Sequence, residues 1–424
     1  MLDIVVVGGG LIGSAAAKYL ASSGARVVLI AAPEPSPQEW ADSEVFGGWF
    51  DEGRITRHLD IHPVWAQLAS ASIARYQSIA KDSGIEFHRR NGYLAVGPAD
   101  SDFIAGTLGV AKKRGVPVTL LRGAHEIREA LPTYRPDPKT GNIQGIWERD
   151  DAGSVNPRSL VKAQQKLAET SGCRLVYDLA TSVERSSKGF RITAKKCGSF
   201  DATRVLLCPG SFLFAQTLFP PGVPKPQIKV MKPMLIRIPV RDQKALYKYW
   251  DPKAPLPSIM AAQEDSRSAS EKEGFHSHPR FWWSMAPIPY PDGVAYIKFG
   301  DSADFWGREC VDADEARLWF ADPQARLPYA AKAERLARMA AAFFPDLEVN
   351  EYVVDVCAVA TTPNECPVID QLAPGFFFAG GGNGYAAKSS DEIGRLAARL
   401  VLHQPWDSQL SRSHFSQFLS TSKL

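Results

Sequence analysis

The feature that most constrains this fold lies within the first thirty residues, where an apolar strand leads into a glycine-rich turn. The stretch IVVVGGGLIG has the spacing Gly-x-Gly-x-x-Gly at Gly8, Gly10 and Gly13. An apolar helix over 14–22 and a second strand over 26–30 follow it. This order of strand, turn, helix and strand is far more specific than the glycines alone, and it predicts a dinucleotide-binding unit.

Each glycine of the turn has its own physical task. Gly8 permits the tight turn, Gly10 lets the backbone approach a pyrophosphate, and Gly13 lets the helix pack closely on the strand. The first helical residues, Leu11 and Ile12, lie at a helix N-terminus, where free N–H groups and a partial positive charge attract phosphates. The turn therefore predicts a phosphate cradle; the alternative is a tight turn that holds no ligand.

One element that usually accompanies such a unit is missing. An acidic residue commonly ends the second strand and binds the ribose of the dinucleotide. Here Ala31 and Ala32 occupy that place, and the nearest carboxylate belongs to Glu34, beyond Pro33. Either Glu34 reaches back to the ribose or the ribose is held in another way.

Length, composition and charge exclude several classes of function. A chain of 424 residues with 45% hydrophobic residues is long enough for two or three domains with real cores. The net charge is only +3 and no basic run is present, so nothing argues for nucleic acid. No apolar stretch approaches the length of a membrane span, and the first strand leaves no room for a secretory signal. The six cysteines lack metal-ligand spacing, so we expect no metal and mostly reduced thiols in an intracellular protein.

The C-terminal residues form a second short signal. The chain ends in Ser422-Lys423-Leu424, and a C-terminal Ser-Lys-Leu is an address that the peroxisomal import receptor reads. The polar stretch before it favours an exposed tail. The alternative is that the tripeptide occurs there by accident. We expect a peroxisomal protein, and that location favours chemistry that yields H2O2.

Cofactor-type segments occur at the start, in the middle and at the end of the chain. One apolar strand ends in Cys208-Pro209-Gly210 and another in the glycine-rich run Gly380–Gly384, with β-rich aromatic stretches between them. This alternation predicts an α/β protein with a discontinuous Rossmann-type domain and an antiparallel, β-sheet-based α+β substrate domain. We assign residues 1–60, 151–220 and 351–410 to the first domain, 61–150 and 221–350 to the second, and 411–424 to an exposed tail.

Three further blocks have a recognisable spacing: RITRH at 54–58, YIKFG at 296–300 and CAVATTP at 357–363. Together with the glycine turn they resemble the monomeric sarcosine oxidase family of D-amino-acid-oxidase-like flavoproteins, whose relatives include N-methyltryptophan, pipecolate and fructosyl amino acid oxidases. The resemblance extends over nearly the whole chain. It implies FAD as the cofactor and an amine as the substrate.

The resemblance also implies roles for individual cations. In the family's Arg-x-x-Arg-His stretch the first Arg lies near the flavin and the second binds the substrate carboxylate, which gives these roles to Arg54 and Arg57. A guanidinium suits the second task because its planar fork matches a carboxylate. The family's apolar-Lys-apolar-Gly strand holds a Lys that promotes the reaction of reduced flavin with O2, which implies Lys298. A further carboxylate-binding Lys is Lys388 in one register, whereas the other register places Ala386 there. Without the family context, these residues would be read as a solvated Arg pair and an exposed strand Lys.

A covalent bond to the cofactor is implied as well. The family carries a Cys followed by Pro six places later and by Asp thirteen places later, which is the spacing of Cys357, Pro363 and Asp370. In the family this sulfur is bonded to the 8α-methyl group of the flavin. The alternative is that Cys357 is a buried core thiol, with Cys366 as the nearest rival. The other expected cofactor contacts are Val183, Gly210, Gly381, Gly382, Asn383 and Gly384.

Departures from the family pattern concern the substrate. Trp49 and Phe50 replace histidines that precede the arginine stretch, and Ser302 replaces a histidine that follows the strand of the oxygen-site Lys. The aromatic residues Trp49 and Phe50, together with Trp282 and Trp283, favour a bulkier or aromatic substrate rather than sarcosine. The equally weighted alternative is that these aromatic side chains form core.

The expected function is oxidation of the C–N bond of an amino acid or N-substituted amino acid to an imine, by hydride transfer to FAD with O2 reduced to H2O2. The alternatives are a biosynthetic flavin oxidase for an alkaloid or peptide-derived amine, a flavin dehydrogenase that uses another acceptor, and a non-catalytic flavin-binding protein. Lys298 and the C-terminal signal argue against the dehydrogenase, and Arg57 with Lys298 argues against the non-catalytic protein. No proton-abstracting side chain is obvious, so we expect the amine to bind in its neutral form.

Overall fold

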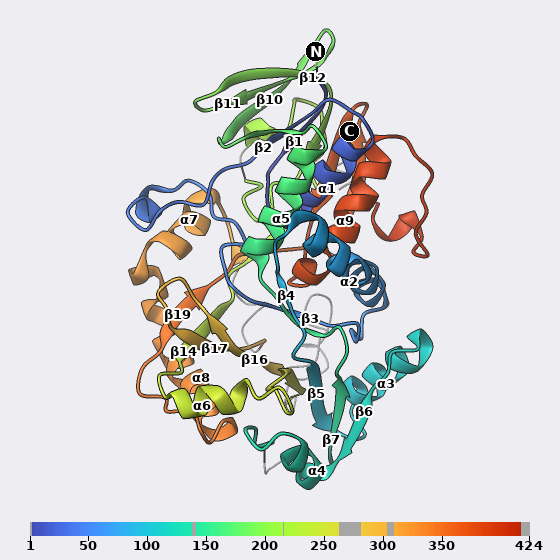
Figure 1. Ribbon diagram of the computed structural model, residues 1–424. Coiled ribbons are helices and arrows are strands. Elements are labelled where there is room, and N and C mark those ends of the chain that lie inside the picture. The colour runs from blue at the N-terminus through green and yellow to red at the C-terminus, as the bar shows by residue number, and fades with distance from the viewer. Residues whose placement is uncertain (1, 138–140, 215, 263–280, 303–308, 417–424) are drawn as a thin grey trace.

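The molecule consists of two lobes, each organised around a large β-sheet (Figure 1). This computed structural model describes residues 2–137, 141–214, 216–262, 281–302 and 309–416. The predicted signal Ser422–Leu424 lies outside the described residues. Figure 1 shows the sheet that contains the N-terminal strand in the upper lobe and the second large sheet in the lower lobe.

The upper sheet is assembled from three distant segments of the chain. Its order is β10-β11-β12-β1-β2-β9, with β22 paired to both β12 and β21. Strands β1, β2, β9, β12 and β22 run parallel to one another, whereas β10, β11 and β21 join by antiparallel pairing. The bounds are β1 Leu2–Val7, β2 Val27–Ile30, β9 Arg174–Val176, β10 Ala180–Ser186, β11 Gly189–Ala194, β12 Gly198–Leu207, β21 Val368–Ala373 and β22 Phe376–Gly380.

Four helices pack on or beside this sheet and on one another. Their bounds are α1 Leu11–Ser22, α2 Pro63–Ser83, α5 Pro157–Thr170 and α9 Ala386–Val401. Helix α9 approaches α1 closely because small residues meet there: a Cβ added at Gly394 would lie 2.5 Å from that of Ala15. Asp391 of α9 is fully buried and accepts bonds from Lys18, Tyr19 and Arg75. This paired carboxylate ties α1 and α2 to α9, so the start of α1 is held in place.

The lower sheet has the order β19-β14-β17-β16-β15-β5-β7-β6. Its described pairs are antiparallel except for β5 and β15, so the expected antiparallel sheet is in fact mixed. The bounds are β5 Tyr93–Pro98, β6 Thr119–Arg122, β7 Ile143–Glu148, β14 Met234–Pro239, β15 Ser258–Ala262, β16 Phe281–Pro289, β17 Ala295–Asp301 and β19 Val353–Val356. Helices α3 Asp102–Arg114, α4 Gly123–Ala130, α6 Gln243–Tyr249, α7 Ala313–Ala321 and α8 Ala330–Phe343 belong to this half of the molecule.

Two small sheets carry residues that the sequence marked as functional. Strand β3 contains Arg54 and pairs with β8, which also pairs with β4. Strand β20 begins two residues after Cys357 and pairs with β13, which also pairs with β18. The bounds are β3 Arg54–Thr56, β4 His88–Arg89, β8 Gly153–Val155, β13 Lys229–Met231, β18 Glu309–Cys310 and β20 Val359–Thr361.

The α/β architecture with a discontinuous Rossmann-type domain is confirmed, but its boundaries differ from the expected ones in three places. Helix α2 lies in the segment assigned to the substrate domain, yet Trp65 and Leu68 pack in the core of the upper lobe. Strand β19, assigned to the dinucleotide-binding domain, pairs with β14 of the lower sheet instead. The tail is not wholly exposed, because Phe415 is buried beside Trp406 and its carbonyl accepts a bond from the backbone of Ile369.

Within the described ranges, no helix is both long enough and apolar enough to cross a membrane. All six cysteines are described and carry free thiols.

Candidate cofactor and substrate site

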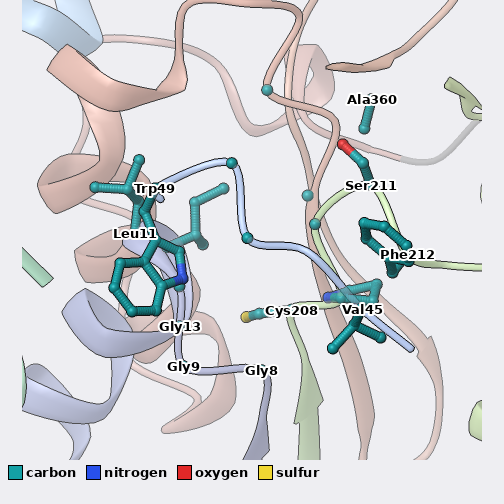
Figure 2. Close-up of a pocket in the computed structure, with 18 of the residues that line it drawn as sticks. Gly8, Gly9, Leu11, Gly13, Val45, Trp49, Cys208, Ser211, Phe212 and Ala360 are labelled. Atoms are coloured by element: carbon teal, nitrogen blue, oxygen red, sulfur yellow. The ribbon is translucent and has the colours of Figure 1, made fainter. Parts of the chain in front are cut away.

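The glycine turn opens onto a cavity of about 290 Å³, which we call the cofactor cavity. Figure 2 shows Gly8, Gly9, Leu11 and Gly13 on one side of it and Ser211, Phe212 and Ala360 on the other. Most of the expected cofactor contacts line this cavity: Gly8, Gly10, Leu11, Ile12, Gly13, Arg54, Gly210, Cys357, Gly381, Gly382 and Gly384. The segments that the sequence placed at the start, middle and end of the chain therefore meet at one surface.

The geometry of the turn requires glycine. Gly8 has φ +101°, and a Cβ there would lie 2.1 Å from the carbonyl oxygen of Cys208. A Cβ at Gly13 would lie 1.8 Å from the carbonyl oxygen of Gly8. Helix α1 begins after Gly10 without a side-chain cap or an acidic residue in its first turn. Its first N–H groups are thus available to a phosphate, so the cavity fits a dinucleotide.

Glu34 does not line the cofactor cavity, and its role at the ribose stays a prediction. Its carboxylate accepts bonds of 2.5–3.0 Å from the guanidinium of Arg158 at the start of α5. Arg158 also binds Glu52 at 2.8 Å. The residues at the end of the second strand that line the cavity are Ile30 and Ala32, and neither side chain can donate or accept a hydrogen bond. The second alternative, a ribose held in another way, fits the structure.

Val183 is likewise absent from the lining of the cavity. It lies in the middle of β10, 1% exposed, and packs in a core cluster of the upper sheet. The chain reaches the cavity three residues earlier, through Asp178, Leu179 and Ala180. The first residue of β10, Ala180, therefore lines the cavity, whereas the expected contact of Val183 with the cofactor stays a prediction.

A second cavity of about 200 Å³, which we call the substrate cavity, adjoins the first. Arg57, Lys298 and Lys388 all line it, although they come from three distant parts of the chain. The two cavities share the lining residues Arg54, Cys357, Val359, Gly384 and Ala387. This junction is where a group bound in the cofactor cavity would face a molecule in the substrate cavity.

Arg57 and Lys388 form one charge cluster around a carboxylate that the sequence analysis did not single out. Asp60 accepts a 3.0 Å bond from Arg57 and lies 3.2 Å from the Nζ of Lys388, and all three side chains are buried. Burial lowers the pKa of Lys388 to about 8, although Asp60 opposes the shift. Two cations against one carboxylate leave a single positive charge, which suits one further anion. The structure thus places Lys388 in the substrate cavity, whereas Ala386 lines the cofactor cavity.

A second carboxylate that was not expected from the sequence holds the segment that contains Arg57. Glu148, at the end of β7, is fully buried and accepts bonds from the backbone N–H groups of His58 and Leu59. It also bonds the ring of His58 at 2.5 Å. Arg57 itself lies over the ring of Tyr93, 4.9 Å from its centre. These contacts fix the direction in which the guanidinium points.

Lys298 belongs to a second charge cluster of the same composition. It is 1% exposed and forms an ion pair with Asp51, which also contacts Arg54. Burial, together with the nearby Arg54 guanidinium, lowers the pKa of Lys298 well below that of an exposed lysine. Asp51 and Asp60 stand three residues outside the two arginines, in the spacing Asp-x-x-Arg-x-x-Arg-x-x-Asp. That regular spacing was the available signal for both carboxylates.

The cysteine thiols differ in where they lie relative to the two cavities. Cys357 is half-buried at the junction of the two cavities, whereas Cys366 is buried in the core of the upper lobe and lines neither cavity. A different rival, which the sequence analysis missed, is Cys208, whose side chain Figure 2 shows beside the glycine turn. Burial raises the pKa of the Cys208 thiol, which disfavours the reactive thiolate. No group of three or more potential metal ligands occurs among the residues that the structure describes.

The aromatic residues that depart from the family pattern divide between core and site. Trp282 is 3% exposed and stacks on Phe343 in the core of the lower lobe. Trp283 instead lines the substrate cavity. Trp49 and Phe50 line the cofactor cavity, and Ser302 lines the substrate cavity.

Asn383 also belongs to the substrate cavity, in a left-handed conformation with φ +48°. Its side chain accepts a bond from the N–H of Thr362 and donates to the carbonyl of Gly381. This residue therefore shapes the glycine loop from within.

Comparison with known sequences gives one family match and several relatives. The family model described as DAO, FAD dependent oxidoreductase, matches residues 3–400. The chain is 31% identical over 224 residues to a monomeric sarcosine oxidase of Streptomyces avermitilis, a match that covers 52% of this chain and 55% of that protein. It is 22% identical over 414 residues to a monomeric sarcosine oxidase of Arthrobacter sp. (strain TE1826), covering 94% and 92% of the two chains. The chain thus spans about half the length of the Streptomyces protein.

Comparison with solved structures supports the same fold. NikD, an unusual amino acid oxidase essential for nikkomycin biosynthesis, superposes with a TM-score of 0.73 at 18% identity, covering 98% of this chain and 97% of that one. Glycine oxidase from Geobacillus kaustophilus superposes with a TM-score of 0.66 at 17% identity, with 98% of both chains covered. At such identities the likeness concerns the fold alone.

Proposed function

The chain belongs to the DAO family of FAD-dependent oxidoreductases, and from this premise we propose that it oxidises the C–N bond of an amino acid or an N-substituted amino acid to an imine, with O2 as electron acceptor. One observation supports this substrate class above the others. Arg57 and Lys388 are buried cations that face the same cavity and share one carboxylate, so the cluster retains a positive charge for an anion.

The redox chemistry is that of FAD, which when bound takes up a hydride from the amine and passes electrons to O2. The protein binds and orients the substrate. Arg57 and Lys388 hold its carboxylate, which fixes the position of the neighbouring carbon in the cavity. The half-buried junction with the cofactor cavity limits water there, which strengthens each of these charge interactions.

The apolar part of the substrate cavity fits a substrate larger than sarcosine. Trp283 stands over Gly300, where a Cβ would lie 2.6 Å from the indole, and Met260 and Met285 complete that wall. Methionine side chains adapt to irregular apolar groups. This lining also favours the second candidate, a biosynthetic oxidase for a bulky alkaloid or peptide-derived amine. Product analysis distinguishes these two candidate functions. A biosynthetic enzyme gives a product in which the imine has reacted with another group of the same molecule, whereas the amino acid oxidase gives a free carbonyl compound.

Lys298 is proposed to promote the reaction with O2. A buried cation next to the junction stabilises the negative charge that develops on oxygen as it is reduced. The test is to incubate the purified protein with N-methyl and cyclic secondary amino acids and to measure peroxide against substrate consumed. About one peroxide per turnover supports the oxidase. Turnover only with an added dye acceptor identifies the dehydrogenase alternative, and no turnover with any amine contradicts the proposal.

We further propose that Cys357 holds the flavin covalently, because it is the half-buried thiol at the junction of the two cavities. Acid precipitation tests this: the wild-type pellet should stay yellow, and the Cys357→Ser pellet should lose its colour. Cys208→Ser and Cys366→Ser are the matched controls and should keep it. Colour lost from the wild-type pellet would show that the flavin is not covalent.

Peroxisomal import through Ser422-Lys423-Leu424 is also a proposal. A fluorescent protein fused before this chain should collect in peroxisomes of a eukaryotic cell, and removal of Leu424 should leave it in the cytosol. Equal distribution of both fusions would contradict the signal.

A further inference from the structure

Lys298 is enclosed, yet any proton it gives away has to be replaced. The side chain is 1% exposed, and its Nζ contacts Asp51 and donates a 3.3 Å bond to the carbonyl of Gly53. Asp51 is itself 4% exposed. Because neither group is open to bulk water, a hydrogen-bonded partner can supply protons to Lys298 while a substrate or product fills the cavity.

Such a partner is present on the other oxygen of the carboxylate. Asp51 Oδ2 contacts Lys298, whereas Oδ1 accepts a 2.6 Å bond from the hydroxyl of Tyr290. Tyr290 lies in the turn between β16 and β17, and it is only partly buried. The three side chains are bonded in series from Lys298, which lines the substrate cavity, to Tyr290, which is partly exposed.

We propose that Asp51 and Tyr290 are a proton line that resupplies Lys298 during the reduction of O2. This inference rests on the proposed oxidase function. The amine gives up a hydride, which carries two electrons and one proton, so that forming H2O2 from O2 requires one further proton. Lys298 donates it and becomes a neutral amine.

The line then restores the charge. Tyr290 gives its hydroxyl proton to Oδ1 of Asp51 and takes another from solvent, so the phenol is never left ionised. The Asp51 carboxyl turns about its Cβ–Cγ bond and passes the proton to Lys298. Across one cycle the three side chains return to their first state, and the solvent has supplied one proton. The proton released when the amine becomes an imine returns to the solvent, and it balances the proton that the solvent supplied through the line.

The surroundings are consistent with this direction of transfer. Burial raises the pKa of Tyr290, so the group acts as a hydroxyl that both donates and accepts. The lowered pKa of Lys298 makes its ammonium a readier donor. The charged and titratable groups that face Lys298 and Tyr290 are Asp51 and Glu52 in the loop, Arg54 on β3, Arg237 on β14, Asp355 on β19, Cys357 before β20 and Tyr296 on β17.

Tyr290→Phe is the sharpest variant because it removes one hydroxyl and retains the ring that packs against Arg237 and Tyr296. We expect reoxidation of the reduced holoenzyme by O2 to slow by about 10-fold or more, with a larger effect in D2O. Anaerobic reduction of the cofactor by substrate should stay within about 2-fold of the wild type, because the substrate is held by other groups. The matched control is Tyr296→Phe, whose hydroxyl bonds Asp292 instead and should leave both rates unchanged.

A second measurement does not depend on turnover. The visible absorption of the bound cofactor is recorded against pH, because loss of the nearby Lys298 charge perturbs it. Asp51→Asn should move this titration to lower pH by about one unit or more, since the ammonium loses its counter-ion, and Asp51→Glu should restore it.

An unchanged rate of reoxidation in Tyr290→Phe overturns the proton line while peroxide formation by the wild type still stands. The proton line is also overturned if the absorption of Asp51→Asn titrates at the same pH as that of the wild type, because Asp51 would then not be coupled to Lys298. A wild type that forms no peroxide removes the oxidase function itself and the need for the line.

Discussion

The two adjoining cavities are built on opposite principles. The cofactor cavity is formed largely by backbone, with glycines at Gly8, Gly13 and Gly381 where a side chain would collide. The substrate cavity is lined by side chains, most of them apolar, and its cations Arg57 and Lys388 are balanced by a buried carboxylate. The first is suited to hold a ligand by shape and by N–H groups, and the second by charge.

This difference determines how each region responds to change. A backbone cradle tolerates no added atom, since neither the strand nor the helix can move aside. A charge cluster tolerates substitution as long as the folded chain can rebalance the charges, so its effects appear in affinity and pH dependence rather than in folding. Single substitutions in each cavity separate the two behaviours.

The largest effect is expected from Gly13→Ala. The new Cβ would lie 1.8 Å from the oxygen of Gly8, so the start of α1 has to move away from β1. We expect the purified protein to lose nearly all bound flavin, measured as absorbance at the flavin band per mole of protein. Gly109→Ala is the control: this position in α3 has open space around it, and alanine should stabilise the helix by up to about 1 kcal/mol. Normal flavin content in Gly13→Ala would break the comparison.

Arg57→Met should leave flavin content intact and weaken binding of a substrate-like carboxylate by about 100-fold, the scale for loss of a buried charge-assisted bond. The dissociation constant of a small carboxylate competitor, followed by the change in flavin absorbance, measures this. Arg57→Lys keeps the charge without the planar fork, so its affinity for the carboxylate should lie between those of the wild type and Arg57→Met. Unchanged affinity in Arg57→Met would assign the anion site to other residues.

Lys388 should give the substrate cavity a pH dependence near pH 8. Its pKa of about 8 means that the ammonium is present below that value and is lost as the pH rises through it. Affinity for the same carboxylate should therefore fall by up to about 10-fold between pH 7 and pH 9. Lys388→Arg is charged at every pH tested, so it should bind the carboxylate tightly without a pH dependence. Lys388→Met carries no charge, so it should bind the carboxylate weakly without a pH dependence. A profile for Lys388→Arg that matches the wild type would assign the titration to another group.

The contrast between the cavities also explains what the sequence could predict. Glycines at Gly8, Gly10 and Gly13 serve a local turn, so their spacing in the sequence is their spacing in space. Asp51 and Asp60 pair locally with Arg54 and Arg57, and their regular spacing around the two arginines was a signal for both carboxylates. Their other partners, Lys298 and Lys388, are hundreds of residues away in the chain, and no local pattern reports those pairings.

Two expected cofactor contacts lie outside the lining of the cofactor cavity, and the reason is the same for both. Glu34 was considered for the ribose because it is near the second strand, but proximity along the chain does not exclude a partner such as Arg158 from another helix. Val183 was placed on the right strand, but which face of a strand meets the cavity depends on how that strand sits in the sheet. The fold class and most cofactor contacts were readable, whereas the partners of charged groups were not.

The smallest effect is expected from Glu34→Gln. Because Arg158 binds this carboxylate outside the cofactor cavity, the change should lower the free energy of unfolding by about 0.5–1 kcal/mol. Its effect on FAD affinity should stay below about 3-fold, less than that of one lost hydrogen bond to the cofactor. Reconstitution of the apoprotein with FAD, in a Cys357→Ser background so that binding is reversible, measures this. A loss of 100-fold would show that Glu34 does reach the ribose.

The position of the shared wall has a consequence for how the protein is made. The elements that close both cavities, from Cys357 through the glycine loop to Lys388, lie in the last part of the chain, and β22 pairs there with β12 from the middle. Such distant pairings form slowly, because the intervening chain has to be arranged first. Neither cavity is complete on a growing polypeptide. We expect flavin to be acquired after the last part of the chain has folded, and a chain that stops before Gly380 to lack part of the wall that both cavities share.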